Sequence, residues 1–218
     1  MCRTDNMVTA PIFAISRLRM GTDGSGITTL VTFMGCPLQC KYCLNKMCHE
    51  PIYEPDGKTL RKGIMLLTPQ ELYDLVTVDN IYFQSTGGGI CFGGGEPTLY
   101  EHFIIDSKKL CGNKWKITLE TCLRCSYNTV QALSNVVDRW IVDVKSMNPF
   151  IYQEYTGVMS GVLQHLRCIQ LLVPQDKVTI KVPHIPGYND DEDLDEVIED
   201  IKQSYGFTNI FKIEYKKI

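Results

Sequence analysis

The chain has 218 residues, which is enough for one domain with a sizeable core. Its net charge of -3 gives no electrostatic sign of nucleic-acid binding, and no apolar run approaches the roughly 18 residues that span a bilayer. We therefore expect a single domain over residues 1–218 that is cytoplasmic by default and binds neither nucleic acid nor a membrane.

The first third of the chain predicts two extended segments, a loop and a helix. Residues 1–9 form a short N-terminal extension, and residues 10–17 are an extended segment before the strand at residues 27–33, which is rich in β-branched residues. Residues 50–62 are polar and contain prolines, which is typical of a loop and here predicts a lid. A helix is expected to begin at Thr68, since the Thr-Pro-Gln-Glu sequence forms a capping box.

Beyond this helix the pattern alternates between strands and helices. Strands are expected at residues 87–92, 116–120, 140–144, 177–182 and 209–215, and helices around residues 100–110, 127–133, 161–172 and 191–204. With the strand at 27–33 this makes six strands, and the alternation predicts parallel β/α units. Right-handed crossovers would close them partly into a barrel, with functional groups at the C-terminal strand ends.

Three cysteines, Cys36, Cys40 and Cys43, lie in the pattern CxxxCxxC on a short loop after the first of these strands. A cubane iron–sulfur cluster held by three cysteines keeps one iron free for a small molecule, whereas clusters that only carry electrons normally have four protein ligands. Zinc, with Cys48 or His49 as a fourth ligand, is an alternative, although the spacing differs from the usual CxxC knuckle. The pattern favours the open cluster.

The chain contains ten cysteines in all, and a disulfide framework is the simplest explanation of so many. That explanation suits small secreted domains, and this chain is neither small nor visibly secreted. Cys122 and Cys125 form a CxxC pair that could be redox-active or bind metal, but we favour a structural role.

Polar and glycine residues follow several of the predicted strands. The glycines of residues 93–97 would let the backbone approach a ligand and accept bonds from its ammonium group. Glu120, Asp143 and Lys145 would suit a bound cation or an amino-acid-like ligand, and Lys181 adds a second cation. A tight turn and structural ion pairs are the alternatives.

The cysteine loop, residues 35–43, resembles the cluster loop of radical S-adenosylmethionine (SAM) enzymes. The fuller pattern is similar to the glycyl-radical-enzyme activating enzymes, the family of pyruvate formate-lyase activating enzyme. The supporting motifs are residues 23–27, 87–89, 93–97, 143–145, 155–157 and 182–187. The resemblance implies an α/β fold, a partial (β/α)6 TIM-like barrel of the radical SAM type.

The resemblance also implies a set of site residues around one 4Fe-4S cluster, since no cysteine-rich insert follows Cys48. Three irons would be bound by Cys36, Cys40 and Cys43, and the amino and carboxylate groups of SAM would chelate the fourth. The residues that would contact SAM are Tyr42, Leu44, Gly94, Gly95, Glu96, Asp143, Val144, Lys145 and Lys181. The positions that match a monovalent-cation site are Glu120, Thr121, Asp143 and Val144.

The implied reaction is reductive cleavage of SAM to methionine and a 5'-deoxyadenosyl radical. That radical would abstract hydrogen from a backbone glycine of a partner glycyl radical enzyme, with electrons from a reduced flavodoxin or ferredoxin type of donor. Two alternatives stay open: a radical SAM enzyme that modifies a peptide or small molecule, and a non-catalytic iron–sulfur or zinc module.

Overall fold

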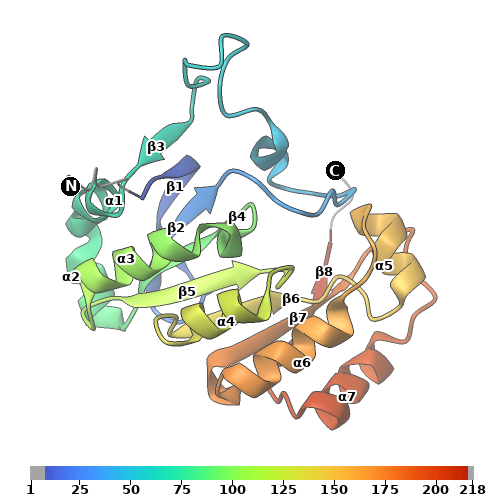
Figure 1. Cartoon of the computed structure of the whole chain (residues 1–218). Helices are drawn as coiled ribbons and strands as arrows, with labels where there is room; N and C mark the ends of the chain where they lie inside the picture. Colours follow the sequence, from blue (N-terminus) through green and yellow to red (C-terminus); the bar gives the residue numbers. More distant parts are fainter. Residues whose placement is uncertain (1–7, 216–218) are drawn as a thin grey trace.

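Six parallel strands form the centre of the structure, a computed structural model that describes residues 8–215 (Figure 1). They are β2 (Ile27–Phe33), β4 (Gly89–Gly94), β5 (Lys116–Thr121), β6 (Arg139–Asp143), β7 (Val178–His184) and β8 (Ile210–Glu214). Each pairs in parallel with the next in this order. The six strands expected from the sequence are therefore confirmed, and the open parallel sheet fits a partial TIM-like barrel.

Two antiparallel strands extend the sheet at the edge beside β2. β1 (Ala10–Met20) pairs with β2, and the short β3 (Met65–Leu67) pairs with β1. The sequence predicts only residues 10–17 of β1. It does not predict β3, because three residues are too few to show an alternating pattern.

Within residues 8–215, seven α-helices connect the strands, and five of them pack side by side in a layer on one face of the sheet (Figure 1). The layer consists of α1 (Pro69–Val76), α3 (Glu101–Cys111), α4 (Tyr127–Ser134), α6 (Val162–Leu172) and α7 (Leu194–Tyr205). The capping box of α1 is present, since the Thr68 and Glu71 side chains each accept a hydrogen bond from the other's backbone N–H.

Two α-helices and four short 3-10 helices lie outside the sequence prediction. They are α2 (Asn80–Thr86), α5 (Pro149–Thr156), η1 (Lys46–His49), η2 (Thr77–Asp79), η3 (Pro97–Tyr100) and η4 (Gln175–Lys177). Helix α5 carried a start signal in Asn148, whose side chain caps the helix, and in Pro149 at its first position. These elements are short, so periodicity alone does not predict them.

A cluster of buried aromatic rings includes the last residue of β2 and a residue of β4. Phe33 stacks on Phe92 at 5.4 Å between ring centroids and meets the edge of Phe103 at 5.7 Å, and all three rings are buried. Aromatic pairs at these spacings add to the hydrophobic gain from burial. This packing gives a firm base to the cysteine loop, which begins directly after Phe33.

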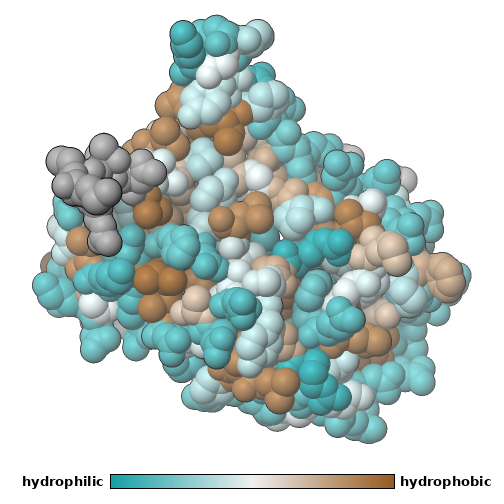
Figure 2. Space-filling view, viewed as in Figure 1, coloured by the Kyte–Doolittle hydropathy of each residue, from teal (hydrophilic) through white to brown (hydrophobic). Residues whose placement is uncertain are grey.

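Residues 50–62 project from the body between η1 and β3 (Figure 1). An isolated bridge joins Tyr53 to Leu60 across this projecting loop, and its tip is hydrophilic (Figure 2). Residues 1–7 of the predicted N-terminal extension lie outside the described residues, and β1 begins at Ala10. Within residues 8–215 no helix is long and apolar enough to cross a bilayer.

Candidate functional site

A cavity of about 650 Å³ opens at the C-terminal ends of the parallel strands. Its volume lies within the range of small-molecule sites, roughly 300–1,000 Å³. The predicted residues that line it are Cys36, Cys40, Tyr42, Cys43, Leu44, Gly94, Gly95, Glu96, Glu120, Thr121, Asp143, Lys145 and Lys181. Val144 does not line the cavity; its side chain is buried and its backbone N–H bonds Lys181 on β7.

The cysteine loop is held in place from two sides by backbone hydrogen bonds. On one side Glu96 N–H donates to the Gly35 carbonyl at 2.8 Å. On the other, the N–H groups of Gln39 and Lys41 donate to the last residues of α5, at 2.8 and 3.1 Å. The unexpected helix α5 therefore anchors the loop that carries the three cysteines.

The glycines at the end of β4 are required by close backbone contacts. A Cβ on Gly95 would lie 2.1 Å from the Gly35 carbonyl oxygen, and one on Gly94, whose φ is +85°, would lie 2.5 Å from Thr32 Cβ. A side chain at either position would displace the cysteine loop or β2. These glycines thus place the strand end and the loop together at the cavity.

The carboxylate of Glu96 is buried and fully hydrogen-bonded. It accepts from Thr121 Oγ1 at 2.6 Å, from Cys122 N–H at 2.9 Å, and from both the N–H and the hydroxyl of Thr98. Glu96 therefore joins the ends of β4 and β5. Its predicted contact with the SAM amino group stays a prediction.

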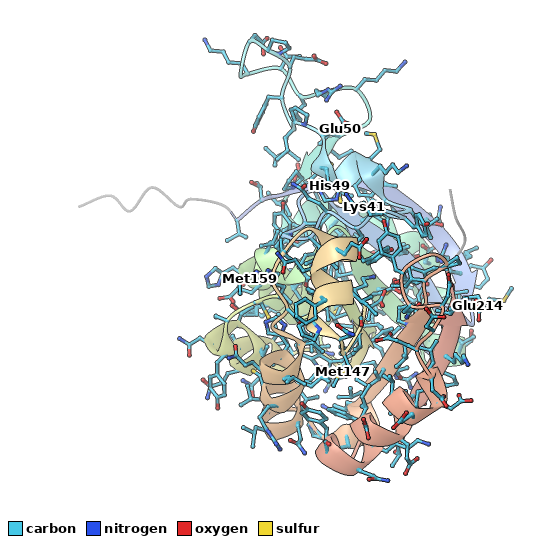
Figure 3. All side chains as sticks on the ribbon, turned by 90° about the vertical axis from the view of Figure 1, so that its right-hand side faces the viewer. Lys41, His49, Glu50, Met147, Met159 and Glu214 are labelled. Atoms are coloured by element: carbon cyan, nitrogen blue, oxygen red, sulfur yellow. The ribbon has the colours of Figure 1, made fainter. Side chains whose placement is uncertain are left out.

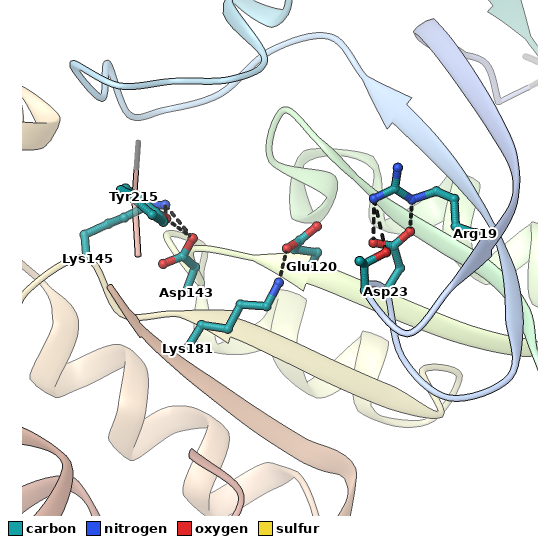
Figure 4. Close-up of polar contacts among 8 residues, drawn as sticks. Arg19, Asp23, Glu120, Asp143, Lys145, Lys181 and Tyr215 are labelled. Atoms are coloured by element: carbon teal, nitrogen blue, oxygen red, sulfur yellow. Dashed lines mark hydrogen bonds and ion pairs between the residues drawn. The ribbon is translucent and has the colours of Figure 1, made fainter. Parts of the chain in front are cut away.

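Ion pairs occupy the wall of the cavity that β5 to β8 provide (Figure 4). Lys181 Nζ lies 2.6 Å from Glu120, and Lys145 Nζ lies 2.6 Å from both Asp143 and the Tyr215 hydroxyl. Burial favours the neutral amine of Lys145, but the charge and hydrogen bond of Asp143 together with its other neighbours outweigh burial and keep the Lys145 pKa well above its usual value. Burial opposes the charged form of Lys181 as well, but Glu120 and the other acidic neighbours raise the Lys181 pKa, so both lysines are cationic at neutral pH.

Two buried polar atoms at the cavity have no hydrogen-bond partner among residues 8–215. They are Asp143 Oδ1 and the Tyr155 hydroxyl. A buried polar atom without a partner costs free energy, so such atoms indicate where a ligand or ion completes the structure. These two atoms would pair with a hydrogen-bond donor or a cation, which fits the binding of a polar cofactor such as SAM.

The three loop cysteines have different neighbours. The neighbouring Cys122 thiol lowers the pKa of Cys36, and the neighbouring Cys48 thiol lowers the pKa of Cys43. Burial raises the pKa of Cys40 to about 11. All nine described cysteines are free, which agrees with the expectation against a disulfide framework; Cys2 lies outside the described residues.

Several residues at the cavity were not assigned to the site by sequence reasoning. Arg19 pairs with Asp23 on the side of β1 (Figure 4), and Tyr155 and Tyr215 line the opposite side. Asp23 belongs to a motif that the sequence singled out, and Tyr215 is the last residue of a predicted strand. Cys122 gave only a CxxC signal, and its position beside Cys36 depends on packing between loops.

The strand-end cavity and its cysteine loop are those expected of a radical SAM enzyme, and the comparison with known proteins gives the same class. The chain belongs to the radical SAM superfamily, whose family model matches residues 30–201. Membership implies SAM and a 4Fe-4S cluster as cofactors, and the chain is an enzyme of this superfamily.

Several named relatives are activating enzymes. Choline trimethylamine-lyase activating enzyme of Oleidesulfovibrio alaskensis is 26% identical, over 96% of this chain and 84% of its own. Pyruvate formate-lyase 1-activating enzyme of Escherichia coli strain K12 is 29% identical, over 88% and 74%. Pyruvate formate-lyase-activating enzyme of Clostridium pasteurianum is 32% identical, over 69% and 59%.

Solved structures show the same fold at lower identity. Streptococcus suis SuiB bound to precursor peptide SuiA has a TM-score of 0.59 and 14% identity, over 86% of this chain and 38% of its own. QueE from Escherichia coli has a TM-score of 0.50 and 14% identity, over 94% and 93%. The likeness to these two proteins concerns the fold alone.

Proposed function

We propose that this protein is an activating enzyme that generates a radical on a backbone glycine of a partner glycyl radical enzyme. The observation that carries the proposal is the single cavity where Cys36, Cys40 and Cys43 meet the charged strand ends. The named relatives indicate the branch of the superfamily, since they include activating enzymes for several different lyases and a dehydratase.

The three cysteines would hold the 4Fe-4S cluster at the mouth of the strand ends. When bound, the cluster supplies one electron that cleaves SAM to methionine and a 5'-deoxyadenosyl radical. A flavodoxin or ferredoxin type of protein would supply that electron. The projecting loop, residues 50–62, would act as a lid or contact the partner.

The charged wall of the cavity would orient SAM. Lys145 would face the carboxylate of SAM, and the hydrogen bonds of its ammonium group with Asp143 and Tyr215 support this role by restricting its position. Lys181 is less suited to binding the SAM carboxylate, because Glu120 neutralises its charge. A lysine also cannot donate the two parallel hydrogen bonds by which an arginine binds a carboxylate. The Asp143 Oδ1 atom would bind a monovalent cation or a donor group of the ligand.

The test is electron paramagnetic resonance after anaerobic reconstitution, chemical reduction, and mixing with SAM and a glycyl radical enzyme. The enzymes to use are the one encoded nearest to this gene, choline trimethylamine-lyase and pyruvate formate-lyase. We expect the doublet of a glycine radical with at least one of them. Formation of 5'-deoxyadenosine with no doublet on any partner would reject the activating role and favour a peptide or small-molecule substrate.

A further inference from the structure

A second set of metal-binding side chains lies beside the cysteine loop. The sulfur atoms of Cys43 and Cys48 and a ring nitrogen of His49 all lie within 4.8 Å of one another. Among residues 8–215, no other group of three histidine, cysteine, aspartate or glutamate side chains is so close. Neither Cys48 nor His49 lines the cavity at the strand ends.

Backbone hydrogen bonds fix the position of this set. The N–H of Cys48 donates to Asn45 at 2.9 Å within η1, and its carbonyl accepts from Gly35 N–H at 2.7 Å. Cys43 N–H donates to the carbonyl of Cys40 at 3.2 Å. These bonds fix the backbone positions from which the two sulfurs come within 4.8 Å of each other.

The set is open to solvent on one side. Cys48 is buried, whereas His49 is exposed and lies at the base of the projecting loop (Figure 3). An ion can therefore reach the two sulfurs past the imidazole ring.

The spacing of the three atoms suits a single ion. Tetrahedral zinc with Zn–S of about 2.3 Å and Zn–N of about 2.05 Å sets its sulfur ligands about 3.8 Å apart and sulfur and nitrogen about 3.5 Å apart. Ligand atoms within 4.8 Å need to close by roughly 1 Å at most for the sulfur pair, and by roughly 1.3 Å at most for sulfur and nitrogen, to meet those values. The sulfurs of a cluster, in contrast, bind different irons, so they stand farther apart than the ligands of one ion.

We propose that Cys43, Cys48 and His49 bind one thiophilic divalent cation of the Zn²⁺ or Fe²⁺ class in the protein that has no cluster. Two thiols and a neutral imidazole bind the ion with release of two protons, and the two thiolates neutralise its charge. Water or another small ligand takes the fourth position. Cys43 would also ligate the cluster, so the single ion and the cluster exclude each other.

The first test is anaerobic titration of cluster-free protein with Zn²⁺ against a chromophoric chelator, and with Co²⁺ to follow thiolate-to-cobalt charge-transfer absorption. We expect one ion per chain. Loss of a residue that only orients a metal ligand weakens metal binding by roughly 10-fold to 100-fold. His49→Ala and Cys48→Ser each remove a ligand itself, so we expect each to weaken Zn²⁺ binding by more than that. Because His49 is exposed, its variant keeps the test valid even if Cys48→Ser misfolds.

Cys40→Ser is the matched control, because Cys40 lies in the cysteine loop and outside the proposed set. We expect Cys40→Ser to bind Zn²⁺ with unchanged affinity. Loss of binding in Cys40→Ser with retention in Cys48→Ser would place the ion among the three loop cysteines and overturn the proposal. Absence of stoichiometric binding in the unmodified protein would overturn it too.

A second measurement tests the mutual exclusion. One equivalent of Zn²⁺ should slow cluster assembly, followed by visible absorption, in the unmodified protein and should have little effect in Cys48→Ser. Equal inhibition of both proteins would overturn the exclusion. Neither readout uses SAM or a partner enzyme, so failure of the activating role would leave this result unchanged.

Discussion

Tyr215 shows how one side chain sets the charge arrangement of the cavity. It follows β8, is largely buried, and its hydroxyl bonds both Asp143 and Lys145. Its ring also lies under the Lys145 ammonium at 5.0 Å. Burial and the neighbouring carboxylate hold the Tyr215 pKa well above its usual value, so the hydroxyl keeps its proton and can donate.

We therefore predict that Tyr215→Phe weakens SAM binding to the reconstituted protein by about tenfold. Hydrogen bonds to charged groups contribute about 1.5–3 kcal/mol, and about 1.4 kcal/mol is tenfold in affinity. Calorimetric titration with SAM measures the change. Tyr127→Phe, at a half-exposed tyrosine of α4, is the control. An unchanged affinity in Tyr215→Phe would show that Tyr215 does not position Lys145.

Glu96 gives a second prediction at this scale, for stability. Both carboxylate oxygens of Glu96 accept hydrogen bonds from donors. Glu96→Gln replaces one of these oxygens by an NH₂ group, which cannot accept, so at least one buried donor loses its partner. We expect a loss of about 1–3 kcal/mol in the free energy of unfolding, measured by urea denaturation of cluster-free protein. Glu154→Gln, at an exposed residue of α5, should change it by less than about 0.5 kcal/mol. Equal midpoints for the two variants would contradict this role of Glu96.

At the scale of elements, Asp79 joins β1, β2 and the start of α2. It is fully buried and accepts from Arg17 Nε at 2.9 Å and from Thr29 Oγ1 at 2.8 Å. Burial disfavours the carboxylate, but these hydrogen bonds outweigh it and lower the Asp79 pKa. The edge of the sheet therefore depends on one ionised side chain.

Because the folded-state pKa of Asp79 is lowered, the free energy of unfolding depends on pH in the acidic range. The contribution of Asp79 is present above the unfolded pKa of about 3.9 and is lost as the pH falls through the lower folded value. We predict that Asp79→Asn reduces stability near neutral pH and flattens its decline in acid. Urea denaturation across pH about 7 to 3 measures this. A variant that keeps the full acid dependence would show that other carboxylates carry it.

The helices and strands also show which parts of the fold and the site can be predicted from the sequence. The six parallel strands were predictable because each is an apolar run in an alternating pattern, and parallel strands bring their C-terminal ends to one edge. Most predicted site residues therefore lie at one cavity. The contacts of Tyr215 with Asp143 and of Cys122 with Cys36 were not predictable, since they depend on side-chain packing between elements distant in sequence.

At the scale of the whole molecule, the projecting loop is separate from the cavity. No residue of 50–62 lines it. We predict that replacing residues 53–60 by a two-glycine turn leaves SAM cleavage within about twofold and lowers the glycine-radical yield on the partner by about tenfold or more, since such loops carry partner contacts. Product chromatography and spin counting measure the two. An equal loss of both would show that the loop shapes the SAM site instead.

The central claim is that the cysteine loop and the strand-end cavity together cleave SAM. The most direct test is the 5'-deoxyadenosine formed after anaerobic reduction of reconstituted protein with SAM. We predict formation by the unmodified protein and by Cys168→Ala, a control on α6 that does not line the cavity, and none by Cys36→Ala. Undiminished 5'-deoxyadenosine from Cys36→Ala, or none from the unmodified protein, would contradict it.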